Sequence, residues 1–167
     1  MPVALYNPDM TDLPALSADC SACAALCCVG LTLDKGPLFS FDKPAGTPCH
    51  HLSRHACAVH ADLTAIGNGG CVAYDCAGAG QRVVQARFNG ESWRDDPTLL
   101  PAMLRDFARL KPLHERMVAL TQAAELPLSP ELETERQSLL TRTARHWADT
   151  PALAAAFDAF LAKLPQP

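Results

Sequence analysis

Four of the eight cysteines in this 167-residue chain are crowded into one short segment, and this crowding limits the folds open to the chain. The segment has the spacing Cys20-x2-Cys23-x3-Cys27-Cys28. Cys27 and Cys28 do not easily bond to each other, because a disulfide prefers Cα atoms about 5.5 Å apart and adjacent residues lie about 3.8 Å apart. Packing in a core does not require neighbouring thiols. Such crowding is more typical of a site for a thiophilic metal or an iron–sulfur cluster.

The residues around these cysteines favour a helix over residues 17–30. Alanine is abundant there, Ser17 is a candidate N-cap and Gly30 is placed to end the helix. At about 100° per residue, Cys28 lies about 80° from Cys20 around the helix axis. Three thiols fall within about 60° of one another, and they belong to Cys20, Cys23 and Cys27. The sequence therefore predicts one helical face that presents a set of thiols.

Four more thiols follow in two short segments. The segment 49–60 holds two cysteines and four histidines, and the segment 71–76 holds the last two cysteines. Zinc takes four ligands, and an iron–sulfur cluster commonly takes four cysteines. Eight thiols are thus enough for two four-thiolate sites, or for one site with spare cysteines. The candidate metal ligands are Cys20, Cys23, Cys27, Cys28, Cys49, Cys57, Cys71 and Cys76.

Three histidines near these cysteines are further candidate ligands, although a single histidine is more often a surface or hydrogen-bonding residue: His50, His51 and His60. Tyr74 and Asp75 lie between two candidate ligands and suit hydrogen bonding to them, with plain packing an equally good interpretation. The stretch Gly78-Ala79-Gly80 lacks the Lys-Ser/Thr of a phosphate-binding loop. A catalytic thiol paired with a histidine would leave seven thiols unexplained.

The overall charge and hydropathy exclude several classes of partner. A net charge of −4 gives no electrostatic reason to expect nucleic acid or an anionic membrane as a partner. No apolar run approaches the length of about 20 residues that spans a bilayer. The segment 1–7 has neither the basic nor the apolar region of a signal peptide. We therefore expect a cytoplasmic protein, in a compartment where thiols stay reduced and clustered cysteines indicate a metal before a disulfide framework.

The composition divides the chain into two parts. Residues 1–90 are rich in Cys, Gly and Pro, whereas residues 91–167 have the apolar spacing of amphipathic helices. We expect a mainly α fold in which a small, irregular, metal-stapled module (1–90) packs against a helical extension (91–167), as one compact unit. A stretch so poor in regular structure needs a further source of stability, and a bound metal would supply it.

Residues that commonly begin or end helices and turns predict the individual elements. Residues 1–16 are expected to be irregular, and residues 31–48 to form a loop with a short strand or hairpin near 38–41. Helices are expected from about Gly78 to Arg87, from Asp96-Pro97, from Ser129-Pro130 to about Trp147, and from Thr150-Pro151 to Leu164. Pro112 is expected to kink or split the second of these near Leu110.

The cysteine pattern resembles that of the YkgJ-like CxxCxxxCC proteins, which are described as zinc- or iron-chelating or as iron–sulfur cluster proteins. The chain has Leu26 where that family often has Gly, and Gly69-Gly70 before Cys71 where it often has Arg-Pro. The matching stretches are Cys20 to Cys28, Cys49-x2-Leu52, Cys57-Ala58-Val59-His60 and Cys71-x2-Tyr74-Asp75-Cys76. The resemblance implies that the cysteines hold zinc, iron or a cluster.

A closer resemblance, over about residues 19–120, is to the cysteine-rich N-terminal region of certain bacterial pentapeptide-repeat proteins. The chain itself has no pentapeptide repeats. A related cysteine motif occurs in flagellin lysine-N-methylases, which keeps an enzymatic role open by analogy. The stretches that carry the closer resemblance are Asp19 to Cys28, Asp42 to Cys49, Gly70 to Gln81 and Leu113-His114-Glu115.

These observations lead to the hypothesis of a cytoplasmic protein that holds an iron–sulfur cluster, or zinc or iron, through clustered thiolates. The bunched thiols differ from the two separated ligand pairs of a zinc finger, which favours iron or more than one metal. One alternative is a redox or modifying enzyme that uses the metal centre on a partner protein. Another is a store for Cu(I) or a similar soft metal, with copper the less favoured cofactor. The pattern names no catalytic residue.

Overall fold

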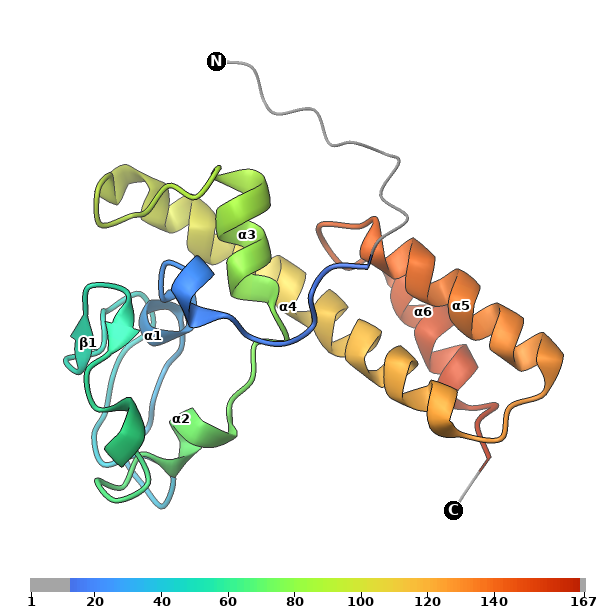
Figure 1. Ribbon diagram of the computed structural model, residues 1–167, viewed down its shortest axis with the longest axis horizontal. Coiled ribbons are helices and arrows are strands. Elements are labelled where there is room, and N and C mark those ends of the chain that lie inside the picture. The colour runs from blue at the N-terminus through green and yellow to red at the C-terminus, as the bar shows by residue number, and fades with distance from the viewer. Residues whose placement is uncertain (1–12, 166–167) are drawn as a thin grey trace.

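The computed structural model describes residues 13–165, and it confirms a mainly α fold (Figure 1). Part of the expected irregular lead-in, residues 1–12, lies outside the described residues. The α-helices are α1 (Leu26–Gly30), α2 (Gly69–Ala73), α3 (Ala79–Arg87), α4 (Leu100–Gln122), α5 (Pro130–Ala144) and α6 (Pro151–Leu161). The short 3₁₀ helices are η1 (Cys20–Ala22), η2 (His60–Asp62), η3 (Pro97–Leu99) and η4 (Ala123–Glu125).

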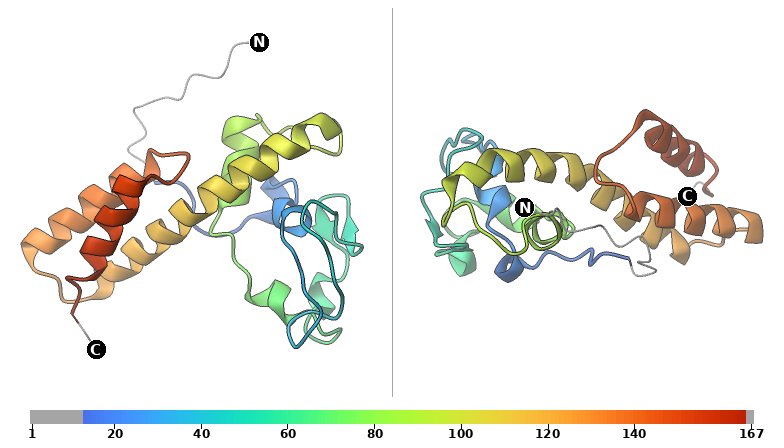
Figure 2. Two further views of the ribbon diagram at one scale, coloured as in Figure 1. Left: turned by 180° about the vertical axis from the view of Figure 1, so that it is seen from behind. Right: turned by 90° about the horizontal axis from the view of Figure 1, so that it is seen from above.

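Helix α4 joins the two parts of the molecule. Its first half packs against α1 and α3 beside the cysteine-rich loops, and its second half packs against α5, which in turn packs against α6 (Figures 1 and 2). Of the two effects expected of Pro112, the split is wrong, because α4 continues through this residue, and the kink stays a prediction. Helix α4 contacts both parts, so the division of the chain into a cysteine-rich module (1–90) and a helical extension (91–167) stays a prediction.

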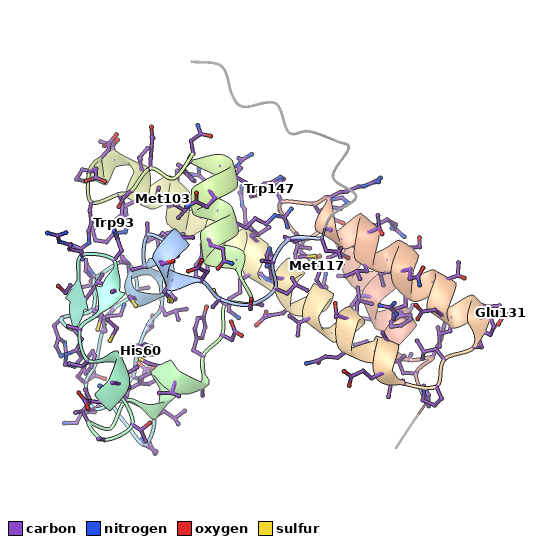
Figure 3. All side chains as sticks on the ribbon, in the orientation of Figure 1. His60, Trp93, Met103, Met117, Glu131 and Trp147 are labelled. Carbon is purple, nitrogen blue, oxygen red and sulfur yellow. The ribbon has the colours of Figure 1, made fainter. Side chains whose placement is uncertain are left out.

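The buried apolar side chains form one cluster that follows α4 from end to end. Met103 lies on the half of α4 near α3, and Met117 lies on the half near α5 (Figure 3). Both are fully buried, as are Leu153 and Phe160 of α6. The cysteine-rich part and the helical part thus share a continuous core.

Side-chain caps fix the starts of the C-terminal helices where the sequence predicted them. Ser129 accepts a hydrogen bond from the Leu132 N–H, and Thr150 accepts one from the Leu153 N–H. Asp96 caps η3, which leads directly into α4. A proline follows each of these caps at the first helical position, where its missing N–H costs nothing.

The expected continuous helix over residues 17–30 is wrong. The chain forms the single turn η1, then an extended residue at Cys23, and begins α1 at Leu26. Ala25, directly before α1, has a φ of 55°, in the left-handed region. Consequently the cysteines do not share one helical face.

Hydrogen bonds from distant residues explain this break. The Gln85 side chain donates to the Ala22 carbonyl at 2.8 Å, and the Trp93 indole donates to the Ala24 carbonyl at 2.7 Å. A continuous helix would use both carbonyls for its own backbone bonds. Tertiary contacts therefore override the helical preference of the alanines.

The segment between α1 and α2 has little regular structure. Leu33 and Lys43 exchange two backbone hydrogen bonds of 2.8 and 2.9 Å, which close a hairpin-like loop. The strand expected near residues 38–41 does not form. A hairpin of two short strands that the sequence did not predict follows the loop, with β1 (Leu52–Ser53) antiparallel to β2 (Ala56–Cys57).

In the described part of the chain, residues 13–165, each helix is too short or too polar to cross a lipid bilayer.

Candidate metal centre

All eight cysteines lie among the described residues, and all are free thiols. Their mutual electrostatic interactions form one network of two groups that Cys28 joins, because Cys28 interacts with Cys20 and Cys27 as well as with Cys49 and Cys71. We call the first group the first thiol set, and it comprises Cys20, Cys23, Cys27 and Cys76. We call the other the second thiol set, and it comprises Cys28, Cys49, Cys57 and Cys71. The two sets adjoin where Cys27 is followed by Cys28 in α1.

The first thiol set lies at the N-terminal end of α3. Cys76 lies three residues before the first residue of this helix, and its carbonyl accepts the Ala79 N–H at 3.0 Å. A Cβ atom built on Gly80 would lie only 2.7 Å from the Cys23 sulfur, so Cys23 packs directly against the first turn of α3. Cys23, Cys27 and Cys76 are partly buried against the hydrophobic core.

Two glutamines of α3 hold the chain around Cys20. Gln81 accepts the Asp19 N–H at 2.6 Å and donates to the Ser17 carbonyl at 3.0 Å. One turn later, Gln85 donates to the Ala22 carbonyl. These bonds fix the η1 turn, and with it Cys20, beside the same end of α3.

The glycines at the start of α3 allow other chain segments to approach the helix closely. Gly78 has a φ of 79°, and a Cβ on it would lie 2.1 Å from the Ala15 carbonyl oxygen. Gly80 has the close contact with Cys23 described above. The weak likeness of this stretch to a phosphate-binding loop is therefore explained by the need for close approach between chain segments.

Backbone pairing brings the second thiol set together. The Cys49 N–H donates to the Cys28 carbonyl at 3.0 Å, and the Leu52 N–H donates to the Cys49 carbonyl at 2.9 Å. Leu52 is the partner of Cys57 in the hairpin β1–β2. Cys71 lies on α2 and interacts electrostatically with the other three members.

A buried lysine lies beside the second thiol set. Lys43 is only 4% exposed. Its ammonium donates to the carbonyls of Val29 (3.1 Å), Leu31 (2.5 Å), Pro44 (3.2 Å) and Thr47 (3.0 Å). It also interacts with the thiols of Cys49, Cys28, Cys27 and Cys71. Because a buried cation is costly unless it is paired, this arrangement suits a site that becomes negatively charged.

Burial and hydrogen bonding set the acidity of individual thiols. Burial raises the pKa of Cys23 to about 11 and also raises the pKa of Cys20, Cys49 and Cys71. Cys28 differs, because a hydrogen bond from the Cys27 thiol, helped by the Lys43 charge, lowers its pKa to about 7. The same hydrogen bond, in which Cys27 is the donor, raises the pKa of Cys27.

The Tyr74 hydroxyl is buried next to the first thiol set without a hydrogen-bond partner among the described residues. Burial raises the pKa of Tyr74, with smaller contributions from the Cys27 and Cys76 thiols nearby. A buried donor without an acceptor is costly, and a metal-bound thiolate would be a suitable acceptor. The sequence placed Tyr74 between two candidate ligands but gave no sign that its hydroxyl would be buried.

The candidate histidines lie outside the two thiol sets. The rings of His50 and His51 pack against each other and against Phe41 in tilted or edge-on arrangements, with the ring centroids of His50 and Phe41 4.2 Å apart. His60 is exposed on the cysteine-rich loops, far from α4 (Figure 3). His55 forms a hydrogen bond of 2.6 Å with Ser92. The geometry thus favours thiols over imidazoles as ligands.

One buried histidine connects α4 to the end of the cysteine-rich segment. His114 is fully buried, and its Nδ1 lies 2.5 Å from the Ala77 carbonyl, one residue after Cys76. Its Nε2 lies 3.3 Å from the Arg82 guanidinium. Burial lowers the pKa of His114 to about 4, so the ring is neutral at pH 7, with Nδ1–H donating and Nε2 accepting.

The thiols are ligands that a thiophilic metal prefers. Their side chains, however, are not arranged in a coordination geometry. Across residues 13–165, no three side chains of His, Cys, Asp or Glu are arranged to hold one ion. The electrostatic interactions between the thiols show that the thiols lie near one another. Coordination of one ion would require a closer approach.

The sequence was compared with protein families, solved structures and curated proteins. No family model matches the sequence, and no solved structure matches it. The uncharacterized protein YybG of Bacillus subtilis (strain 168) is 39% identical to the chain over 131 residues. The matched region is 78% of this chain and 47% of YybG, so the chain spans about half the length of this relative.

Proposed function

We propose that this protein binds metal through its clustered thiolates, as an iron–sulfur cluster or as zinc or iron. The observation that carries the proposal is the network of electrostatic interactions that links the eight free thiols. Soft thiolate ligands in groups of four are what zinc and iron–sulfur clusters prefer. The resemblance of the cysteine spacing to the YkgJ-like proteins supports the same chemistry.

The packing of the cysteine-rich segment gives independent support. Between residues 31 and 76, only Leu33 and Leu63 are buried apolar residues. Two buried leucines contribute about 3–6 kcal/mol, far less than the conformational entropy lost by ordering the segment. Metal binding commonly supplies the missing stability in domains of this kind. A reducing compartment such as the cytoplasm would keep the thiols available for it.

The direct test is elemental analysis, with visible absorption, of the full chain purified without oxygen. We expect iron or zinc at near-stoichiometric amounts, with acid-labile sulfide and visible absorption if the centre is an iron–sulfur cluster. The control is a chain with Cys23, Cys27, Cys57 and Cys71 replaced by Ser, which should lose the metal. Absence of iron, zinc and copper from the wild-type protein would rule out the proposal.

The same preparation separates the alternative functions. A reversible spectral change on reduction would indicate a redox centre, whereas zinc would give none. Binding of many Cu(I) ions per chain would indicate a soft-metal store. Chelation of a structural metal should unfold residues 31–76 while α4, α5 and α6 keep part of their helical signal.

A further inference from the structure

We propose that Cys28 and Cys49 form a redox-active pair, which low-molecular-weight disulfides such as oxidised glutathione convert into an intramolecular disulfide. The proposal goes beyond metal binding, because it requires two thiols that lie close together and no bound ion. Both cysteines are free and partly exposed, so a small reagent can approach them from solvent. They belong to segments that are distant in the sequence but adjacent in the fold.

A backbone hydrogen bond sets the distance between the two residues. The Cys49 N–H donates to the Cys28 carbonyl at 3.0 Å. In antiparallel strands, residues paired by backbone hydrogen bonds have Cα atoms about 5.5 Å apart. A disulfide forms most readily at about this Cα separation. The two thiols also interact electrostatically, which places their sulfur atoms near each other.

Further hydrogen bonds hold the chain that follows Cys28 against the chain that precedes Cys49. The Gly46 N–H donates to the Val29 carbonyl at 2.9 Å. The Lys43 ammonium donates to the Val29 carbonyl at 3.1 Å, and it also donates to the carbonyl of Leu31. Because these contacts fix both segments, the two thiols can meet without a large movement of the backbone. A thiol held this close reacts far faster than one from another molecule.

Cys28 has other thiols nearby, so the choice of its partner depends on the backbone. It interacts with Cys20, Cys27 and Cys71 as well as with Cys49. The Cys27 thiol donates a hydrogen bond to the Cys28 sulfur, but adjacent Cα atoms lie about 3.8 Å apart, too close for an ordinary disulfide. The backbone groups of Cys20 and Cys71 are bonded within their own segments. Cys49 is therefore the partner that the fold favours.

The oxidation is a thiol–disulfide exchange in two steps. In the first step, the thiolate of one cysteine attacks a sulfur atom of oxidised glutathione, which forms a mixed disulfide and releases one glutathione thiolate. In the second step, the other cysteine loses its proton and attacks the protein sulfur of the mixed disulfide. The Cys28–Cys49 bond forms, and the second glutathione thiolate leaves. Two protein thiols are thus oxidised, one glutathione disulfide is reduced, and the two released thiolates take up the two protons.

The test uses the full chain, reduced and freed of metal, incubated with oxidised glutathione. The remaining thiols are then alkylated, and disulfides are located by peptide mapping with mass spectrometry. We expect two of the eight thiols to escape alkylation and one cross-link to join Cys28 to Cys49. The same chain unfolded in urea is the control. Shorter loops close more easily in an unfolded chain, so cysteines closer in the sequence should pair there instead.

Variants identify the two partners. Cys28→Ser should lose the cross-link and keep glutathione on Cys49, because the second thiol is missing. Cys57→Ser, outside the pair, is the matched control and should keep the cross-link.

The folded wild-type chain decides the question without any variant. Absence of an intramolecular disulfide, or a main cross-link between any other two cysteines, would overturn the proposal. Neither result bears on metal binding, which elemental analysis of the protein tests separately.

Discussion

At the scale of single residues, Lys43 is the clearest sign of an unusual environment. Lysine is rarely buried unless its charge is paired. Here four carbonyls surround the ammonium, and the thiols of the second set lie nearby. The residue therefore both closes the loop after α1 and supplies positive charge beside the candidate ligands.

Replacement of Lys43 by Met tests this double role. The variant leaves four carbonyls without their donor and removes the positive charge, so we expect the free energy of unfolding to fall by about 3 kcal/mol or more. Metal affinity should fall as well. Urea denaturation and metal titration measure the two effects. Lys35→Met, at an exposed position in the same loop, is the control, and equal behaviour of the two variants would contradict the role assigned to Lys43.

The sequence identifies the cysteines at this scale but not the groups around them. Clustered thiols are recognisable because their spacing is unusual in a chain without disulfides. Lys43 carries no such signal, since a lysine in a loop with prolines is normally solvated. The position of Tyr74 between two candidate ligands gives a signal, but it does not indicate that the hydroxyl is buried. Their environments depend on contacts between distant segments, such as the pairing of Leu33 with Lys43.

At the scale of elements, the helices with strong local signals could be predicted and the cysteine-bearing segments could not. Caps and prolines mark the starts of α5 and α6, and Gly78 marks the start of α3. The helix expected over residues 17–30 fails because α3 and Trp93 capture its carbonyls. Pro112 does not divide α4, because this helix packs against α3 and α5.

The contact between α3 and Cys23 gives a prediction at this scale. In Gly80→Ala the new methyl group would lie 2.7 Å from the Cys23 sulfur. If Cys23 is a ligand, the sulfur cannot move away, so the variant should lose metal. If Cys23 is not a ligand, its side chain can rotate, and Ala should stabilise α3 by about 1 kcal/mol relative to Gly.

Gly69→Ala is the matched control, because Gly69 also lies in a short helix but has open space around its Cα. Thermal unfolding and metal content of both variants decide the question. A Gly80→Ala protein that is more stable and keeps all of its metal would contradict the assignment of Cys23.

At the scale of the whole molecule, a single long helix supports two parts with different sources of stability. The part formed by α5, α6 and the second half of α4 has an ordinary apolar core. The loops between α1 and α3 bury few apolar side chains, and the Lys43 and His114–Ala77 hydrogen bonds contribute to holding them. The mainly helical fold follows from the sequence pattern, whereas the proximity of Cys28 to thiols of distant segments, such as Cys49 and Cys71, required the three-dimensional structure.

X-ray absorption spectroscopy at the edge of the bound metal identifies the atoms that hold it. The full chain, purified without oxygen, should show about four sulfur ligands per metal, at about 2.3 Å if the metal is zinc. A first shell made of oxygen and nitrogen atoms at about 2.0–2.1 Å would mean that the cysteines do not hold the metal, and it would contradict the account.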